Sequence, residues 1–289
     1  MTAWHTQENG EWVKTEITGK HNLNDDGEWD GRYKFTYMVA APEMADTIYC
    51  TYAATLNGAE VSTDAEDPFT YSVQAYLDGR MQKSTDEKMR TLAAYMATYG
   101  SYAQRYFDVN TDNLADANVE SLYGPVTIDR SYVNTDAAEQ VIEDSIENAT
   151  AEVTSHSLIL DAATTLRYIV TLEDESVLPN AYLAYRVACS EDSFKYAKIV
   201  RNKREDGSIR LVADIVGIKA PDMTDAYEAY ICVKNGSSYE QISLTTIYSP
   251  ECYIASRLAK SSNETLKSTL VALMMYCHAA RDYFDLDAE

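Results

Sequence analysis

The chain has 289 residues, which is enough for two domains of ordinary size. Its 46 acidic residues against 24 basic ones give a formal net charge of −22 at pH 7, so electrostatic repulsion disfavours nucleic acid and an anionic membrane surface as partners. The sequence contains no run of about 18 apolar residues and no charged-then-apolar leader, so we expect neither membrane insertion nor a signal peptide in this segment.

The first 30 residues contain all three tryptophans, Trp4, Trp12 and Trp29. Residues 11–17 alternate weakly between polar and apolar and predict a strand, whereas residues 22–31 predict a turn-rich loop. Two interpretations of the tryptophans stay open. In the first, Trp12 packs under a sheet and Trp29 covers its edge. In the second, the flat rings are exposed and stack on the apolar face of a sugar ring.

Strands and then a helical hairpin are predicted next. Residues 32–39 alternate in a strand-like pattern, residues 41–46 contain a Pro-Glu-Met turn, and residues 47–56 form a second extended segment. Residues 71–107 predict a short helix followed by a long amphipathic helix, in which apolar residues recur every three or four positions. A Ser/Thr-x-x-Glu capping box at residues 84–87 predicts where the long helix begins.

Acidic segments follow the hairpin. Residues 108–113 alternate carboxylates and amides as a calcium loop does, but they lack its sixth-position Gly, and Val119 stands where the bidentate Glu would be. We therefore interpret them as an acidic helix end, and we interpret Asp25, Asp26 and Asp30 as a solvated acidic turn. Residues 119–156 are predicted to be an acidic linker, with a short helix around Val141 because apolar residues there have helix-like spacing.

The remaining residues, 157–289, are predicted to form a second module. Residues 158–160 are a continuous apolar run, typical of a strand that is covered on both faces. Further strands are predicted at residues 166–170, 181–188, 194–201, 209–215 and 226–234. A second helical hairpin is predicted at residues 248–284, with a capping box at residues 261–264.

The helical hairpins of the two modules match each other at a constant separation. Tyr71 corresponds to Tyr248 and Tyr106 to Tyr283, and the residue numbers differ by 177 in both pairs. Such a correspondence indicates an internal duplication. We predict an α+β fold with a tandem duplication, in which each module is a small antiparallel β-sandwich or sheet packed against a C-terminal helical hairpin. The modules are residues 1–118 and 157–289, joined by the linker 119–156.

One segment resembles a known family. Tyr99-Gly-Ser-Tyr-Ala-Gln-Arg-Tyr-Phe107, followed by Asn110-Thr-Asp-Asn-Leu-Ala115, resembles a repeat module of secreted and cell-surface proteins from anaerobic, fibre-degrading gut bacteria, many of which carry dockerins. The second copy departs from the pattern, with Cys277 and His278 where the family usually has Gly and a small residue. Residues 157–168 resemble the strand that opens a full module. The resemblance implies a secreted or bacterial cell-surface location and a larger, multimodular, cellulosome-associated protein.

The sequence offers little for catalysis, a cofactor or a metal. It contains no Gly-x-Ser-x-Gly elbow, no His-Glu-x-x-His helix and no Gly-rich phosphate loop. The odd number of cysteines without a close pair predicts neither a disulfide framework nor a zinc site. We predict a non-enzymatic protein with no cofactor and no metal, while a carboxylate pair of the glycosidase type stays open. The histidines and cysteines concerned are His5, His21, His156, His278, Cys50, Cys189, Cys232, Cys252 and Cys277.

The aromatic residues suggest a function. The chain has 23 tyrosines against five phenylalanines, and tyrosine offers a large ring with a polar group at a partly wet surface. We predict a polysaccharide-binding protein whose exposed rings stack on a plant cell-wall polysaccharide, with cellulose favoured. The candidate binding residues are Trp12, Trp29, Trp4, Tyr33 and Tyr52. The second module has no tryptophan, so it would bind through tyrosines or support the first.

The alternative is a structural spacer or protein-adhesion module. It predicts that exposed aromatic residues are scattered, whereas the binding hypothesis predicts that they gather on one face.

Overall fold

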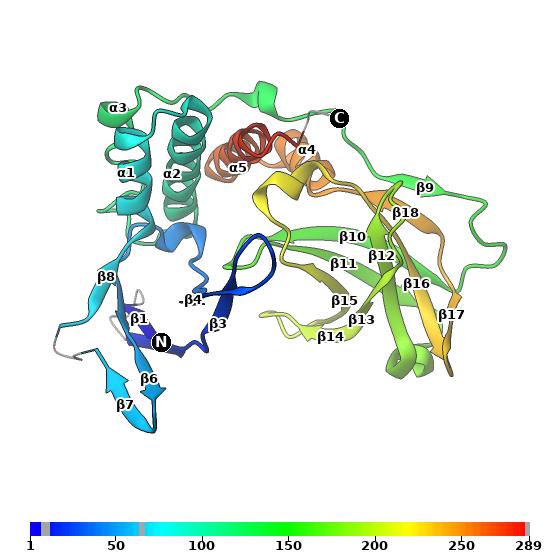
Figure 1. The fold of residues 1–289 in the computed structure, drawn as a ribbon. Coiled ribbons are helices and arrows are strands. Elements are labelled where there is room, and N and C mark those ends of the chain that lie inside the picture. Colours follow the sequence, from blue (N-terminus) through cyan, green and yellow to red (C-terminus); the bar gives the residue numbers. More distant parts are fainter. Residues whose placement is uncertain (7–11, 64–66, 287–289) are drawn as a thin grey trace. The chain divides into compact units, whose positions relative to one another are not determined.

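A computed structural model describes residues 1–6, 12–63 and 67–286. It combines helices with antiparallel sheets, and it divides into two compact units, Met1–Thr127 and Ile128–Glu289 (Figure 1). The boundary falls inside residues 119–156, which the sequence assigns to a linker. Among the described residues, no helix has both the length and the apolar character needed to cross a membrane.

The first unit contains a four-stranded antiparallel sheet in the order β2-β1-β5-β8. Alternation along β5 turns Ile48 and Cys50 toward Ala3, and the three residues form a small buried cluster. Two additional hairpins, β3–β4 and β6–β7, pair only within themselves. The strands are β1 (Thr2–Thr6), β2 (Trp12–Glu16), β3 (Lys20–Leu23), β4 (Trp29–Lys34), β5 (Ile48–Thr51), β6 (Ala53–Leu56), β7 (Ala59–Ser62) and β8 (Phe69–Tyr71).

Helices α1 (Val73–Lys83), α2 (Glu87–Phe107) and α3 (Val119–Leu122) follow in the first unit. Their apolar residues meet in one core, which includes Leu77 of α1, Ala94 of α2 and Val119 of α3. Helix α2 also contacts the 3-10 helix η1 (Ala41–Glu43). The contact is close at Gly100, where an added Cβ would lie only 2.8 Å from the Met44 sulfur.

A buried amide organises the acidic segment after α2. The Nε2 group of Gln104 donates hydrogen bonds to the carbonyls of Asn110 at 3.0 Å and Asn113 at 2.9 Å, and its Oε1 accepts one from the Ala115 N–H at 2.8 Å. Asp108 ends the helix in the left-handed conformation, with φ of 58°. The loop conformation is therefore explained by side-chain capping from within the unit.

The second unit contains two larger antiparallel sheets. One has four strands in the order β10-β11-β15-β14; the other has the order β13-β12-β16-β18-β9, with β17 paired to β16 (Figure 1). The strands are β9 (Gln140–Ile142), β10 (Ala151–Ile159), β11 (Thr165–Leu172), β12 (Ala181–Val187), β13 (Lys195–Lys198), β14 (Val200–Lys203), β15 (Ile209–Val216), β16 (Tyr227–Asn235), β17 (Ser238–Gln241) and β18 (Thr245–Tyr248).

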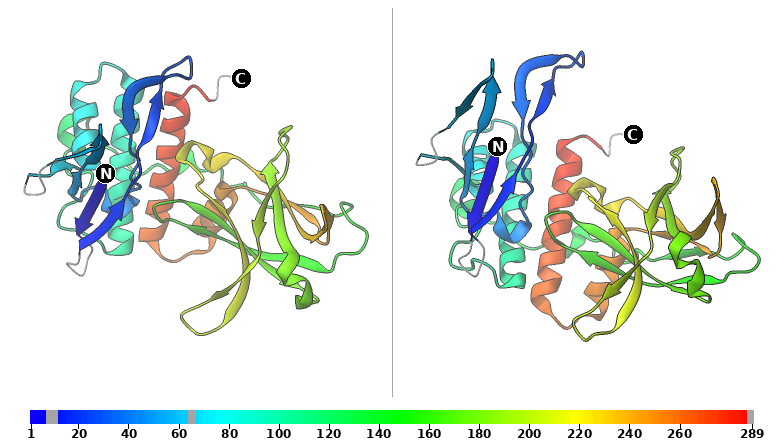
Figure 2. Two further views of the ribbon diagram at one scale, coloured as in Figure 1. Left: turned by 60° about the horizontal axis from the view of Figure 1, so that its bottom comes forward. Right: turned by 90° about the horizontal axis from the view of Figure 1, so that it is seen from below.

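Two helices follow these sheets, α4 (Pro250–Lys260) and α5 (Glu264–Tyr283). The apolar stripe of α5, which includes Leu270 and Cys277, is fully buried. Figure 2 shows α5 in red beside the 3-10 helix η4 (Ala220–Thr224) in yellow, and the two elements are in contact. The other 3-10 helices are η2 (Arg130–Tyr132) and η3 (Glu175–Asn180).

One predicted helix is wrong. Residues 140–142, within the segment where the apolar spacing predicts a short helix, form strand β9 and pair with β18. The helical pattern there consists of only a few apolar positions, and intrinsic propensity is a weak prior that pairing at a sheet edge overrides. Residues 151–156, also assigned to the linker, form part of β10.

The N-cap residues of the two long helices lie two residues after the serines of the predicted capping boxes. The Asp86 side chain accepts a hydrogen bond from a backbone N–H group in the first turn of α2, and the Asn263 side chain accepts one in the first turn of α5. Ser84 and Ser261 instead end the preceding helices, because their own N–H groups donate to carbonyls in the last turns of α1 and α4, those of Arg80 and Arg257. Each serine also bonds forward, because the Ser84 Oγ accepts a hydrogen bond from the Asp86 N–H at 3.2 Å and the Ser261 Oγ accepts one from the Asn263 N–H at 3.1 Å.

Four of the five cysteines are buried, and all five are free thiols. Burial raises the pKa of Cys232 to about 11 and that of Cys277 to about 12. Cys189 is the exposed one, and it lies in a turn with φ of 60°.

Candidate functional site

The β3–β4 hairpin carries an exposed aromatic cluster, which consists of His21, Trp29 and Tyr33. The sequence predicts a loop at Trp29, but this residue begins strand β4. Its indole stacks on the His21 ring, with centroids 4.8 Å apart and planes inclined by 22°. Tyr33 meets Trp29 edge-on at 5.7 Å. The indole N–H donates a 2.8 Å hydrogen bond to the Arg32 carbonyl, which fixes the direction of the ring.

The rings of this cluster are open to solvent. Trp29 is 50% exposed and Tyr33 is 56% exposed, and all residues of β4 are exposed. The pairing brings His21 opposite Tyr33 and Leu23 opposite Trp29, so the cluster is a set of cross-strand neighbours. Such pairs stabilise a hairpin by about 0.2–1 kcal/mol each, which is a structural role that exists beside any binding role.

The other candidates from the sequence lie elsewhere. Trp4 and Trp12 belong to the paired strands β1 and β2, and their side chains fall outside the described part of the chain. Tyr52 packs against the small core of the first unit and meets Phe35 edge-on at 5.4 Å. Burial raises the pKa of Tyr52. The structure thus groups Trp29 with Tyr33, adds His21, and gives Tyr52 a packing role.

The second unit has an aromatic face on its larger sheet. Cross-strand pairing places Tyr182, Tyr196, Tyr230 and Tyr239 on one side of strands β12, β13, β16 and β17. Tyr196 and Tyr239 stack with centroids 3.7 Å apart, and Tyr182 meets Tyr239 edge-on at 5.8 Å. The rings overlie small buried residues such as Ala184, so part of their role is to cover the sheet.

Cations cover much of this aromatic face. The Lys198 ammonium lies 4.3 Å from the centre of the Tyr182 ring, and that of Lys234 lies 5.8 Å from Tyr239. Tyr196 retains 40% exposure. This surface is therefore less free for a planar ligand than the indole of Trp29.

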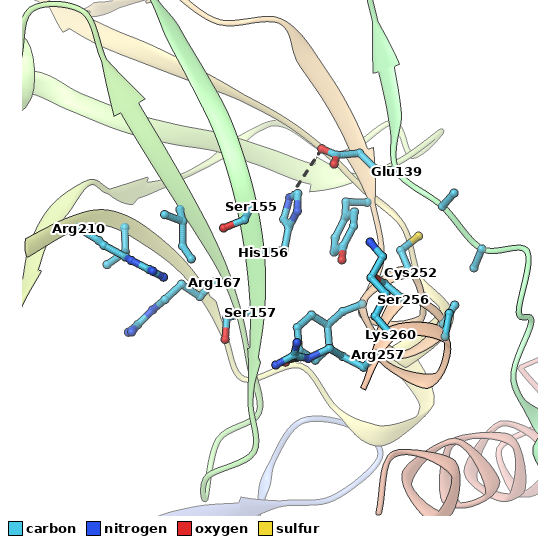
Figure 3. Close-up of a pocket in the computed structure, with 18 of the residues that line it drawn as sticks. Glu139, Ser155, His156, Ser157, Arg167, Arg210, Cys252, Ser256, Arg257 and Lys260 are labelled. Carbon is cyan, nitrogen blue, oxygen red and sulfur yellow. Dashed lines mark hydrogen bonds and ion pairs between the residues drawn. The ribbon is translucent and has the colours of Figure 1, made fainter. Parts of the chain in front are cut away.

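The third candidate site is a cleft of about 890 Å³, which lies entirely within the second unit. Its walls are edge strand β10, the face of the four-stranded sheet that carries Arg167 and Arg210, helix α4, and the segment around Glu139. Figure 3 shows Arg167 and Arg210 on the sheet side of the β10 serines, and Arg257 and Lys260 on the α4 side. The volume lies within the range of about 300–1,000 Å³ that is typical of ligand pockets.

The cleft is basic although the chain is acidic. Five of its lining residues are arginine or lysine, and one is a carboxylate, Glu139. The cations are Arg167, Arg204, Arg210, Arg257 and Lys260. Sequence reasoning missed this arrangement. Alternation along β11 and β15 indicates which residues share a face, but only the fold brings β10, β15 and α4 together.

A buried imidazole closes one side of the cleft. His156 stacks on Tyr248 with ring centroids 3.6 Å apart, and its Nε2 lies 3.9 Å from a Glu139 oxygen, beyond hydrogen-bond distance. Burial lowers the pKa of His156 to about 4 and raises the pKa of Glu139. The imidazole is therefore neutral at pH 7, and the charge of the cleft comes from its arginines and lysine.

Within the described ranges, no group of three or more His, Cys, Asp and Glu side chains is placed to hold a metal ion. No family model, curated protein or solved structure matches this chain.

Proposed function

We propose that the chain is a non-catalytic polysaccharide-binding protein, and that cellulose is its first ligand to test. The observation that carries the proposal is the Trp29 indole, which is half exposed, backed by His21 and fixed in direction by its N–H hydrogen bond. An aromatic ring that is already ordered loses little conformational entropy when it stacks on a sugar.

The same hairpin carries polar groups that suit sugar hydroxyls. Asp30 accepts hydrogen bonds from the Asn22 side chain at 2.6 Å and from the Arg32 N–H at 2.9 Å. These bonds lower the pKa of Asp30, so it is a carboxylate acceptor at neutral pH. Trp29 would therefore supply the stacking surface, and Tyr33, whose ring meets the indole edge-on, would supply a hydroxyl group beside it.

The proposal also covers the evolutionary origin of the chain by duplication and its cellular location. The offset of 177 residues supports a tandem duplication in which each module ends in a helical hairpin, and α1–α2 and α4–α5 occupy matching places in the two units. By its resemblance to modules of dockerin-bearing proteins, we place the protein outside the cell or on the surface of a fibre-degrading bacterium, as part of a larger multimodular protein. Trp4 and Trp12 remain candidates beside Trp29.

The test is retention on insoluble cellulose. We expect wild type to be retained and Trp29→Ala to lose at least about 10-fold in affinity, equivalent to about 1.4 kcal/mol of binding free energy, with a smaller loss for Tyr33→Ala. Tyr76→Ala is the matched control, because Tyr76 is 41% exposed on α1 of the same unit. Circular dichroism checks that each variant is folded. Absence of wild-type retention, or equal loss in the control, contradicts the proposal.

A structural spacer or adhesion module is the second candidate. It is favoured by the cross-strand position of the aromatic cluster and by the lysines over the tyrosines of the second unit. In that case Trp29→Ala would lower the free energy of unfolding and leave polysaccharide retention unchanged. Release of reducing sugar from any polysaccharide would instead indicate an enzyme.

A further inference from the structure

Cellulose carries no charge, so binding it does not require the positive charge of the basic cleft in the second unit. Cleft-lining cations usually need a partner of opposite charge, since their mutual repulsion is weakly screened between protein walls. In this chain carboxylates outnumber basic groups about two to one, so partners are abundant. A cleft cation that forms no ion pair within this chain therefore indicates a ligand of opposite charge.

Two of the five cations are already paired. Arg167 makes two 2.8 Å hydrogen bonds to the carboxylate of Asp214, and Arg204 lies 3.2 Å from Asp206 in an exposed turn. The carboxylates of Asp214 and Asp206 neutralise most of the positive charge of these two arginines. They frame the cleft and do not by themselves call for a ligand.

The other three cations are Arg210, Arg257 and Lys260, and none forms an ion pair within 4.0 Å of any described carboxylate. Arg210 still lies near enough to Asp206 to help lower the pKa of that carboxyl, whereas Asp206 is already paired with Arg204. Arg210 comes from β15, and the other two come from the last turn of α4. Arg257 is held by a 3.1 Å hydrogen bond from its Nε to the Tyr253 hydroxyl, which leaves its two terminal NH₂ groups free to bind an anion.

Hydroxyl groups lie between these cations. Ser155 and Ser157 of β10 and Ser256 of α4 line the same cleft, and their hydroxyls form no hydrogen bond with other described residues. Figure 3 shows the two β10 serines between the sheet arginines and the α4 cations Arg257 and Lys260. A ligand that fits these groups carries an anionic group and several hydroxyls.

We propose that this cleft binds a carboxylate-bearing sugar, the uronate unit of an acidic polysaccharide. Arginine matches the two oxygens of a carboxylate with two parallel hydrogen bonds, and the serines suit the ring hydroxyls. The volume of about 890 Å³ exceeds what one small anion needs. The choice of a sugar rests on the proposed function, whereas the choice of an anion rests on the cleft alone.

Part of the charge has a structural explanation, which supplies the control. Arg257 and Lys260 stand at the C-terminal end of α4, where cations stabilise the helix. Arg80 and Lys83 occupy the same place in α1, and Arg80 lies over Tyr76 much as Arg257 lies over Tyr253. In the second unit these helix-end cations face Arg210 across the serines, an arrangement that belongs to this cleft.

Calorimetric titration of the full chain tests the proposal with trigalacturonate, its fully methyl-esterified form and inorganic phosphate as probes. We expect trigalacturonate to bind, its ester to bind at least about 10-fold more weakly, and phosphate to bind more weakly still. Arg210→Gln and Arg257→Gln should each weaken trigalacturonate binding by about 10-fold or more, since a hydrogen bond between charged groups contributes that much. Added salt should weaken it too.

The control variant is Arg80→Gln with Lys83→Gln, which lowers the positive charge at the matching helix end and should leave trigalacturonate affinity unchanged. Equal loss in this control, equal affinity for acid and ester, or no binding of trigalacturonate by wild type overturns the proposal. Phosphate binding as tight as that of trigalacturonate assigns the cleft to small anions and also overturns it. Trp29→Ala should bind trigalacturonate normally, so a failure on cellulose and a failure here are distinguishable.

Discussion

His156 is a histidine that the fold keeps neutral. It lies between Tyr248, on which it stacks, and Tyr168, whose ring it meets edge-on at 4.7 Å. Among the described residues, neither its Nε2 nor the Tyr168 hydroxyl has a hydrogen-bond partner. Burial outweighs the attraction of Glu139 at 3.9 Å and lowers the pKa of His156 to about 4. The residue is therefore a source of acid instability.

The pH dependence of unfolding tests this. The folded-state pKa of about 4 lies below the ordinary histidine value of 6.5, so between these values the unfolded chain binds a proton that the folded chain does not. The free energy of unfolding should therefore decrease as pH falls from about 6.5 to about 4, by up to about 3 kcal/mol.

His156→Phe keeps an aromatic ring on Tyr248 and removes the titrating group. Urea unfolding at several pH values should show a smaller decrease for this variant than for wild type. Because the other groups titrate in both proteins, the difference between the two curves isolates His156. Parallel curves would show that His156 is protonated normally in the folded state.

At the scale of elements, the contact of α2 with η1 depends on a missing side chain. A Cβ at Gly100 would lie 3.1 Å from the Ala115 Cβ and 3.3 Å from the Ala41 carbonyl oxygen, besides the Met44 sulfur. In the second unit the corresponding position holds Cys277, whose sulfur lies 3.9 Å from the Pro221 carbonyl oxygen. The second contact accommodates a larger residue at the same place.

Gly100→Ala should accordingly destabilise the chain. Alanine favours a helix interior by about 1 kcal/mol over glycine, but overpacking costs about 1–3 kcal/mol, and two of the three close atoms cannot rotate away. Gly79→Ala in α1 is the control, because no atom lies within 4 Å of its added Cβ, and it should stabilise. Urea unfolding measures both, and equal stabilisation would show that η1 yields to the methyl group.

The sequence predicts these elements unequally. Long helices such as α2 and α5 have a buried stripe at helical spacing and are evident from it. Strand β9 is not evident from the sequence, because its extended conformation depends on its pairing with β18. No local sequence pattern predicts the cleft. Its residues Ser157, Arg210 and Arg257 are separated from one another by tens of residues, and only the strand order of the folded sheet brings them together. Trp29 was identifiable as a candidate because a tryptophan in a turn-rich acidic segment has no obvious core to enter.

At the scale of the whole molecule, the dominant property is the formal charge of −22. Self-repulsion of this size opposes the compact state, and ion pairs such as those of Arg167 and Arg186 neutralise only part of it. The cleft, with its cations that form no ion pair, is therefore locally positive in a chain whose net charge is strongly negative. A long polyanion would be repelled by the surface around that cleft, whereas a short oligouronate would meet less of it.

Salt should stabilise the folded chain for the same reason. Raising NaCl from about 0.01 M to about 0.5 M shortens the Debye length several-fold, which screens repulsion between exposed carboxylates more than it weakens the partly buried ion pairs. We expect a higher melting temperature at high salt, measured by circular dichroism at constant pH. Sucrose at matched osmolality is the control for non-ionic effects, and a melting temperature that falls with NaCl would show that ion pairs outweigh repulsion.

The single exposed thiol, Cys189, gives the chain a natural attachment point for a reporter group. The other four cysteines are shielded from reagents, and the raised pKa values of Cys232 and Cys277 keep these two thiols protonated. A maleimide dye should therefore label the second unit at one position without any mutation. Fluorescence anisotropy of the labelled chain could then follow its capture by soluble glycans, and energy transfer to a second dye in the first unit could follow movement of one unit against the other in solution.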